Sequence, residues 1–244
     1  MRQPAGRGSY GVDAPYLLFV PALLVVFAVI QGVLTNSPWP IAGAAVVVLL
    51  SSLGLYASRR GKFVVWARLL DDLHLVGDEQ VLDVGCGRGA ILVLAARHLT
   101  TGRAVGVDLW RKSDQSGNDH SVTERNAVLE GVTERVQLET ADMVDLPFGD
   151  ETFDVVVSNL AVHNVKAASG RDKAIDEATR VLRPGGRLLI ADVLSARQYR
   201  QRLAHTGMDE VAWRSLGWRM WFSGPWMRTC LVTAIKPLPK VAGQ

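Results

Sequence analysis

The sequence predicts an α/β fold in which a seven-stranded, mostly parallel sheet ends in an antiparallel hairpin and is preceded by two transmembrane helices. From residue 81 onward, short apolar runs alternate with segments of helical periodicity, as in proteins with parallel sheets. The last two expected strands, residues 210–216 and 230–235, are joined by an aromatic loop and predict an antiparallel hairpin at the sheet edge. Two long uncharged runs near the start predict the membrane helices.

The most informative stretch, residues 81–89, reads VLDVGCGRG. Its apolar start is typical of a buried parallel strand, and Asp83 lies toward the carboxyl end of that strand. Gly85, Gly87 and Gly89 then alternate, and glycine lets the backbone turn sharply and approach a ligand closely. A helical run follows directly. A strand, a glycine turn and a helix N-terminus together predict a nucleotide-type binding site.

The spacing of this loop favours one kind of ligand. A dinucleotide loop reads GxGxxG, and a phosphate-binding P-loop needs Lys followed by Ser or Thr, whereas this chain has GxGxG. Asp83 would repel a pyrophosphate and attract a cation. We therefore expect S-adenosylmethionine (SAM), which carries an ammonium and a sulfonium. The alternative is an ordinary tight turn in a parallel sheet.

Composition limits the remaining possibilities. The 244 residues suffice for one sizeable domain plus an appendage, and 48% of them are hydrophobic. A net charge of +3 is too small to indicate a nucleic-acid partner. The two cysteines, Cys86 and Cys230, form no CxxC pair, so the sequence predicts neither a disulfide framework nor a metal site.

Residues 1–60 are expected to form a transmembrane helical hairpin. Residues 17–35 and 39–57 contain no charged side chain, and each run is close to the roughly twenty residues that cross a bilayer as a helix. Small residues in the second run would allow close helix packing, including packing between copies in a homo-oligomer. A cleavable signal peptide and a soluble helical pair are the alternatives, and the length and charge pattern favour the membrane.

Charge asymmetry predicts the orientation of the hairpin. The connecting turn is uncharged, whereas arginines or lysines flank both runs on their other side: Arg2, Arg7, Arg59, Arg60, Lys62 and Arg68. The positive-inside rule then places both ends, and the domain of residues 61–244, on the cytoplasmic side of the membrane. A linking helix over residues 61–75 is expected to turn Lys62 and Arg68 toward anionic head groups.

The second and third strands supply further acids at their carboxyl ends. Asp108 ends the strand of residues 103–110, nineteen residues after Gly89, where an acid can accept both ribose hydroxyls. Leu109 would then offer an apolar surface to the adenine. Asp142 and Met143 end the third strand, where they are expected to meet the adenine amino group and ring.

The polar segment of residues 111–121 lies between these two strands and has two interpretations. It is either a solvated loop, or a lid that shapes the acceptor site through Asp114, Gln115 and Asn118.

Five motifs in order resemble those of class I SAM-dependent methyltransferases: VLDVGCGRG, AVGVDLW, ADMVDLPF, FDVVVSNLAVHNV and ATRVLRPGGRLLIADV. The nearest branch is the one that includes ubiquinone- and menaquinone-biosynthesis and arsenite methyltransferases. The arsenite members' reactive cysteines are absent, and the hairpin is not part of the family pattern. The resemblance, over about residues 61–237, implies a Rossmann-like sheet and a SAM site. That site would comprise Asp83, Gly85, Cys86, Gly87, Gly89, Asp108, Leu109, Asp142, Met143, Asn159 and Leu160.

The acceptor end of the site is less defined by the sequence. His163 lies just past the fourth strand, expected over residues 153–161, and is the candidate general base if the acceptor must lose a proton; Asn164 would help to orient the acceptor. Four of the seven tryptophans crowd the last part of the chain, where they would pack in the core, line an apolar pocket or enter the membrane interface: Trp213, Trp218, Trp221 and Trp226.

We therefore expect a membrane-anchored methyltransferase that acts on a lipophilic small molecule or a lipid head group. The alternative is a non-catalytic SAM-binding or membrane-scaffolding module, and a dehydrogenase is a more distant third.

Overall fold

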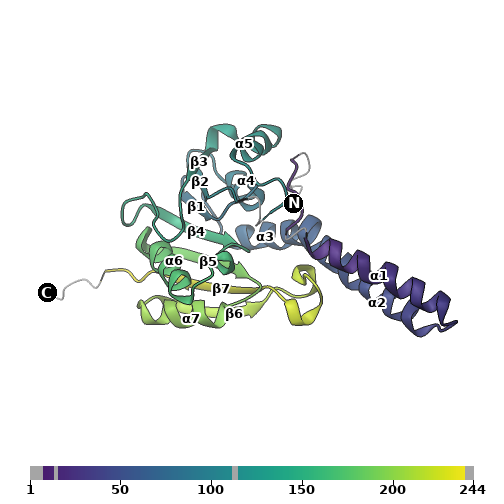
Figure 1. Cartoon of the computed structure of the whole chain (residues 1–244). Coiled ribbons are helices and arrows are strands. Elements are labelled where there is room, and N and C mark those ends of the chain that lie inside the picture. Colours follow the sequence, from purple (N-terminus) through teal and green to yellow (C-terminus); the bar gives the residue numbers. More distant parts are fainter. Residues whose placement is uncertain (1–7, 14–15, 112–114, 240–244) are drawn as a thin grey trace.

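The computed structural model describes residues 8–13, 16–111 and 115–239, with side chains of the first helix described from Val20 onward. An α/β domain forms most of the molecule, and a pair of antiparallel helices projects from one side of it (Figure 1). Arg2, Arg7 and Asp114, on which parts of the sequence interpretation rest, lie outside the described residues.

The sheet has seven strands in the order β3-β2-β1-β4-β5-β7-β6, which confirms the predicted Rossmann-like architecture. Strands β1 to β5 are parallel, and β7 runs antiparallel to both β5 and β6, as the predicted hairpin requires. The strand order reverses between β1 and β4, and ligands bind at such switch points. The strands are β1 Gln80–Val84, β2 Arg103–Asp108, β3 Val136–Thr140, β4 Phe153–Asn159, β5 Leu182–Asp192, β6 Asp209–Ser215 and β7 Cys230–Ile235.

Helices cover both faces of the sheet. Alternate residues of a strand point to opposite faces, so Val81 packs with α3 and α4 while Leu82 packs with α6 and α7. Both residues are fully buried. The helices of this domain are α3 Lys62–Asp71, α4 Ala90–Ala96, α5 His120–Leu129, α6 Ala168–Arg180 and α7 Ala196–His205.

Two strands end earlier than the sequence pattern predicted. β2 was expected to reach Trp110 and β4 to reach Ala161, but they end at Asp108 and Asn159. Trp110 and Leu160 adopt left-handed backbone conformations, with φ of 55° each, which a β-strand cannot accommodate. The backbone therefore turns immediately after each strand, at the edge where a ligand would bind.

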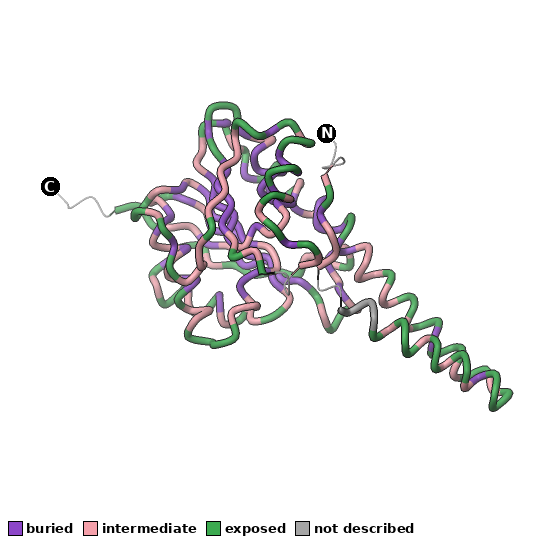
Figure 2. The backbone as a smooth tube through the Cα atoms, turned by 45° about the horizontal axis from the view of Figure 1, so that its top comes forward, coloured by how far each residue is buried: buried purple, intermediate pink, exposed green. Residues whose placement is uncertain are grey.

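The projecting pair consists of α1 (Tyr16–Leu34) and α2 (Trp39–Tyr56), which pack against each other and expose most of their other surface (Figure 2). Among the described residues, one helix, Trp39–Asp71, is long and apolar enough to cross a membrane. The apolar part of α1 that is described in full, Val20–Leu34, is too short to qualify as a membrane-crossing helix. The predicted helical hairpin is therefore present, whereas its two membrane spans are not confirmed.

The helix pair is joined to the α/β domain through one continuous helix. α2 continues without a break through a π-helical turn, η1 (Ala57–Gly61), into α3, so the boundary predicted at residue 60 falls inside one helix. A Cβ at Gly54 would lie 2.3 Å from the carbonyl oxygen of Phe222, and one at Gly61 only 1.8 Å from that of Arg219. These glycines allow the helix to lie directly on the backbone of the loop between β6 and β7.

Lys62 was expected to face lipid head groups, and the structure contradicts this. Its side chain is buried, and its ammonium lies 2.9 Å from the carboxylate of Asp13. Burial of a lysine requires such a partner, because an unpaired ammonium in a low-dielectric interior is very unfavourable. The sequence pattern of the helix could not reveal a partner 49 residues away. Arg68, in contrast, is exposed.

Candidate cofactor and acceptor site

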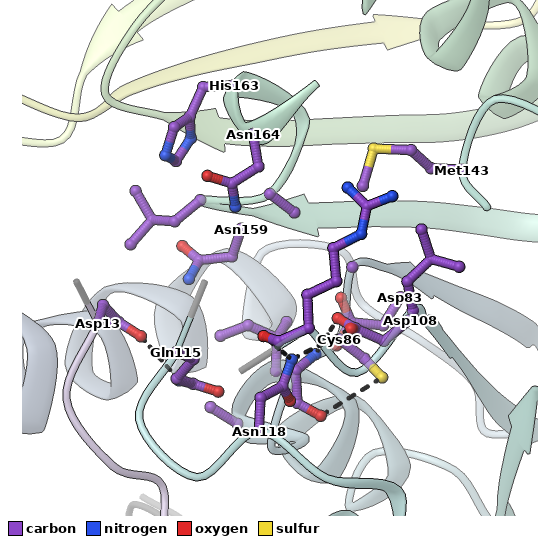
Figure 3. A pocket seen from close by; sticks show the side chains of 18 of the residues that line it. Asp13, Asp83, Cys86, Asp108, Gln115, Asn118, Met143, Asn159, His163 and Asn164 are labelled. Carbon is purple, nitrogen blue, oxygen red and sulfur yellow. Dashed lines mark hydrogen bonds between the residues drawn. The ribbon is translucent and has the colours of Figure 1, made fainter. Parts of the chain in front are cut away.

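A cavity opens at the carboxyl ends of β1, β2 and β4, where the strand order reverses. Figure 3 shows the side chains that line it. Asp83, Cys86 and Asp108 gather on one side of this view, and Asn159, His163 and Asn164 lie across the cavity from them. Of the residues expected to bind the cofactor, all line this cavity except Gly89, which precedes α4 and where an added Cβ would lie 2.8 Å from Cγ2 of Thr123.

The glycine loop forms the floor of the cavity. Gly85 and Gly87 have φ of 73° and 51°, conformations that L side chains rarely adopt. A Cβ at Gly85 would also lie 2.2 Å from the Cβ of Ala161. Cys86 between them is buried, and burial together with the carboxylates of Asp83 and Asp108 raises the pKa of its thiol. Cys86 is therefore a neutral wall residue rather than a nucleophile.

Asp83 is the residue most clearly suited to a cationic ligand. Its side chain is buried, and burial is the main cause that raises its pKa to about 7; the Asp108 carboxylate raises it further. Within the described part of the chain, no group donates a hydrogen bond to its Oδ2 atom. A buried carboxylate oxygen without a partner is unfavourable unless a ligand supplies one. The residues here thus fit the ammonium or sulfonium of SAM.

Asp108 connects the second strand to the glycine loop. Its Oδ2 accepts a hydrogen bond from the Gly87 amide at 2.9 Å, and its Oδ1 accepts one from the Trp110 amide at 2.6 Å. Asn118 also donates to Oδ1, at 3.2 Å. These contacts hold the carboxylate at the end of β2, where the sequence predicted that it meets the ribose.

The polar segment after β2 is a wall of the cavity. Gln115 and Asn118 both line it, which favours the lid interpretation over the solvated loop for these two residues. Gln115 accepts a hydrogen bond from the Arg88 amide at 3.0 Å and so also shields the glycine loop.

The predicted adenine end lies farther along the same edge. Leu109, Asp142 and Met143 line the cavity together, from the ends of β2 and β3. Oδ1 of Asp142 accepts a hydrogen bond from the Val144 amide at 3.2 Å, which orients the carboxylate. An apolar side chain, a thioether and an oriented acceptor are suited to a flat ring that carries an amino group.

Asn159 and Leu160 close the cavity from the end of β4. The Trp66 indole donates a hydrogen bond to Asn159 Oδ1 at 2.8 Å, and Trp66 is fully buried beneath it. The sequence pattern did not predict this contact, because only the packing of α3 on the sheet brings the two residues together.

His163 lies on the acceptor side and has a carboxylate partner. Its Nδ1 is 2.6 Å from Oδ1 of Asp192, and its amide donates to Oδ2 of the same residue at 3.0 Å. Asp192 is buried at the end of β5, and the Tyr199 hydroxyl donates to it at 3.1 Å. A carboxylate on Nδ1 stabilises the tautomer that carries the lone pair on Nε2. The sequence pattern predicted a role for His163 but not for Asp192.

A segment near the N-terminus covers part of the site; we call residues 8–13 the N-terminal strap. Tyr10 packs edge-on against Phe63 of α3, with ring centroids 5.0 Å apart. Asp13, which lines the cavity, accepts hydrogen bonds from Lys62, from Ser58 and, at 2.8 Å, from Gln115. The strap has no sequence motif that would have identified it.

The loop between β6 and β7, residues 216–229, forms the remaining wall. Phe222 and Met227 line the cavity, so the loop does border the site as one interpretation of its aromatic residues predicted. Among the residues described around the cavity, the four tryptophans are absent from its lining; Trp218 instead stacks on Tyr56 at the base of α2.

This fold, with a glycine loop and acids at the ends of β1 and β2, is similar to that of class I SAM-dependent methyltransferases. Residues 82–190 match the family model described as a methyltransferase domain.

Known proteins agree with this class. The 27-O-demethylrifamycin SV methyltransferase of Amycolatopsis mediterranei is 36% identical over 52% of this chain and 43% of its own length. The demethylmenaquinone methyltransferase of Symbiobacterium thermophilum is 31% identical over 53% of this chain and 49% of its own. The matches thus span less than half of either relative.

A solved structure shows the same fold. Geranyl diphosphate methyltransferase in complex with geranyl diphosphate and sinefungin superimposes with a TM-score of 0.56 at 19% identity, covering 71% of this chain and 77% of that one. Together, the domain match and the relatives support a SAM-dependent methyltransferase domain in this chain, with SAM as its cofactor.

Proposed function

We propose that this protein is a membrane-anchored methyltransferase that transfers a methyl group from SAM to a lipophilic small molecule or a lipid head group. The observation that carries this proposal is that one cavity is lined both by Asp83, whose Oδ2 atom has no hydrogen-bond partner, and by His163, which is paired with Asp192. A cofactor bound at Asp83 would therefore share one cavity with an acceptor bound at His163.

The residues of this cavity would act mainly by positioning. SAM supplies the methyl group on a sulfonium that already contains its leaving group. Asp83 and Asp108 would hold the cofactor at the strand ends, and the N-terminal strap and Phe222 would exclude water. His163 Nε2 would accept a proton from an acceptor hydroxyl, amine or acidic carbon, and Asp192 would stabilise the resulting imidazolium.

The helix pair supports a membrane location. α2 has 18 residues, so it is roughly 27 Å long, close to the ~30 Å of a bilayer's hydrocarbon core. Its sequence is uncharged, and large apolar side chains are exposed along both helices, among them Leu23, Val33 and Leu49. Water would not favour so much exposed apolar surface on a projecting element.

The ends of α2 also suit the two membrane interfaces. Trp39 is exposed at the far end, and the stacked Tyr56 and Trp218 lie at the near end. Aromatic rings prefer the interface. Arg59 and Arg60 follow, both exposed, and place positive charge beside the α/β domain, as expected for the cytoplasmic side.

An activity assay tests the enzymatic proposal. The full chain in lipid nanodiscs is incubated with methyl-labelled SAM and a bacterial lipid extract, and label in the organic phase is measured. We expect transfer by the wild type, its loss in Asp83→Ala, and its retention in Asp78→Ala, which removes an exposed acid before β1. SAM binding without transfer would instead support the alternative, a non-catalytic SAM-binding module.

Two measurements test the membrane proposal. The full chain should stay with the membrane after alkaline extraction. A cysteine introduced as Ser37→Cys, in the turn between α1 and α2, should react with an impermeant maleimide in intact cells, whereas Arg60→Cys should react only after permeabilisation. Cys86 and Cys230 are buried and should contribute little background. Release by alkali, or the reverse labelling pattern, would contradict the proposed topology.

A further inference from the structure

A second cavity lies between the helix pair and the loop of residues 216–229. Pro21 of α1 and Val47, Leu50 and Leu55 of α2 line one side, and Ser223 and Trp226 of the loop line another. The cavity is thus built where the projecting helices join the α/β domain.

The second cavity adjoins the cofactor cavity. Asp13 and Phe222 line both of them, so these two side chains form a shared wall. Phe222 cannot easily move away with its backbone, because its carbonyl oxygen lies against Gly54 of α2. A molecule that occupied both cavities would pass between a phenyl ring and the strap.

The lining suits an uncharged, apolar occupant. Of the described residues that line it, Asp13 is the charged one, and its carboxylate is paired with the buried ammonium of Lys62. The hydroxyl of Ser51 donates a hydrogen bond to the carbonyl of Val47 at 2.8 Å, so its proton is already satisfied without a polar ligand. Leu50, Leu55 and the rings of Phe222 and Trp226 supply apolar surface.

We propose that this second cavity binds the hydrocarbon chain of the methyl acceptor, while the reactive head of the same molecule occupies the cofactor cavity. This inference rests on the proposed function, whose substrate class it deepens. The occupant would come from the bilayer that surrounds α1 and α2. Phe222 then separates the chain from the head and sets how far the head extends toward the cofactor.

The first arm of the test measures chain binding without catalysis. The full chain is placed in phosphatidylcholine nanodiscs with S-adenosylhomocysteine and a diazirine-bearing hexadecanol, irradiated, and analysed by peptide mass spectrometry. We expect label on the loop peptide that contains Phe222 and Ser223. Leu50→Trp and Ser51→Leu fill the cavity and should reduce that label by roughly tenfold, as expected for an affinity that is weaker by the same factor.

A matched control distinguishes the cavity from the surrounding lipid. Leu49 is the neighbour of Leu50 on α2, but it is exposed and does not line the cavity. Leu49→Trp should leave the loop label unchanged. If the loop is labelled equally in Leu50→Trp, Ser51→Leu and the wild type, the loop meets bulk lipid and the proposal is wrong.

The second arm measures transfer from labelled SAM to the lipid extract. We expect the cavity-filling variants to raise the KM for the lipophilic acceptor while the KM for SAM stays unchanged. An equal effect on both would overturn the proposal. If the wild type transfers no methyl group to any extract, the proposed function fails, and the photolabelling arm still decides whether the cavity holds a hydrocarbon chain.

Discussion

Lys62 Nζ lies 2.9 Å from Oδ2 of Asp13, and this ion pair, in which the lysine is buried, joins the N-terminal strap to the helix that links the projecting pair to the α/β domain. Both residues line the cofactor cavity. Ser58 and Gln115 donate further hydrogen bonds to the same carboxylate. One acid from the start of the chain therefore ties together three separate walls of the site.

Removal of Asp13 alone should destabilise the protein more than removal of Asp13 and Lys62 together. Asp13→Ala leaves the ammonium of Lys62 buried without its acid, and breaking a buried pair in this way costs about 3–5 kcal/mol. The double variant Asp13→Ala with Lys62→Met should recover part of that loss. Denaturant unfolding of the full chain in detergent measures both, and a double variant less stable than Asp13→Ala would contradict the role assigned to the pair.

SAM binding should weaken as the pH falls below about 7, because the pKa of Asp83 is raised to about 7 by burial. A cation requires the carboxylate form, so affinity should fall by up to roughly tenfold per pH unit. Titration calorimetry between about pH 5.5 and 8.5 measures this. Asp83→Asn should bind SAM weakly with no such dependence; an equal dependence in that variant would assign the titration to another group.

The raised pKa of Asp83 also affects the free energy of unfolding of the ligand-free protein. The folded protein retains the Asp83 proton between the ordinary carboxyl pKa of 3.8 and about 7, whereas the unfolded chain loses it. The contribution of Asp83 to the free energy of unfolding should therefore decrease as the pH rises through this range. Compared with the wild type, Asp83→Asn should lose less stability over this interval, which denaturant unfolding at each pH would reveal.

His163→Ala should lower kcat by roughly 10²- to 10⁴-fold if the acceptor loses a proton, while SAM affinity stays within about twofold. Asp192→Asn should also lower kcat and shift the acidic limb of the pH–rate profile, because the carboxylate holds Nδ1 of His163 at 2.6 Å. His205→Ala, at the exposed end of α7, serves as the control. An unchanged kcat in His163→Ala would exclude His163 as the base.

Gly85→Ala should abolish measurable SAM binding, since the added Cβ would clash with Ala161 and the backbone has φ of 73°. Gly131→Ala is a matched control, because its φ is 69° and no atom lies within 4 Å of the new Cβ. Backbone strain of this kind costs about 1–3 kcal/mol. Both variants should lose stability, but only Gly85→Ala should lose binding in calorimetry; normal binding by Gly85→Ala would contradict the role of the loop.

Much of this protein was predictable from local sequence patterns. The strand at residues 80–84, the glycine turn and the acid at Asp108 could all be predicted, because strand periodicity and glycine conformation depend on neighbouring residues. The parallel sheet then brings strand ends to one edge, so Asp83, Asp108 and Asn159 were expected to share a site, and they line one cavity.

Only the tertiary structure decided what surrounds that site. Asp13 meets Lys62, Trp66 meets Asn159 and Asp192 meets His163 across 49, 93 and 29 residues. No periodicity links residues so far apart; their contacts arise from how helices and loops pack on the sheet. The same packing buried a lysine that the sequence placed at the membrane surface, and it created the second cavity between the helix pair and the loop of residues 216–229.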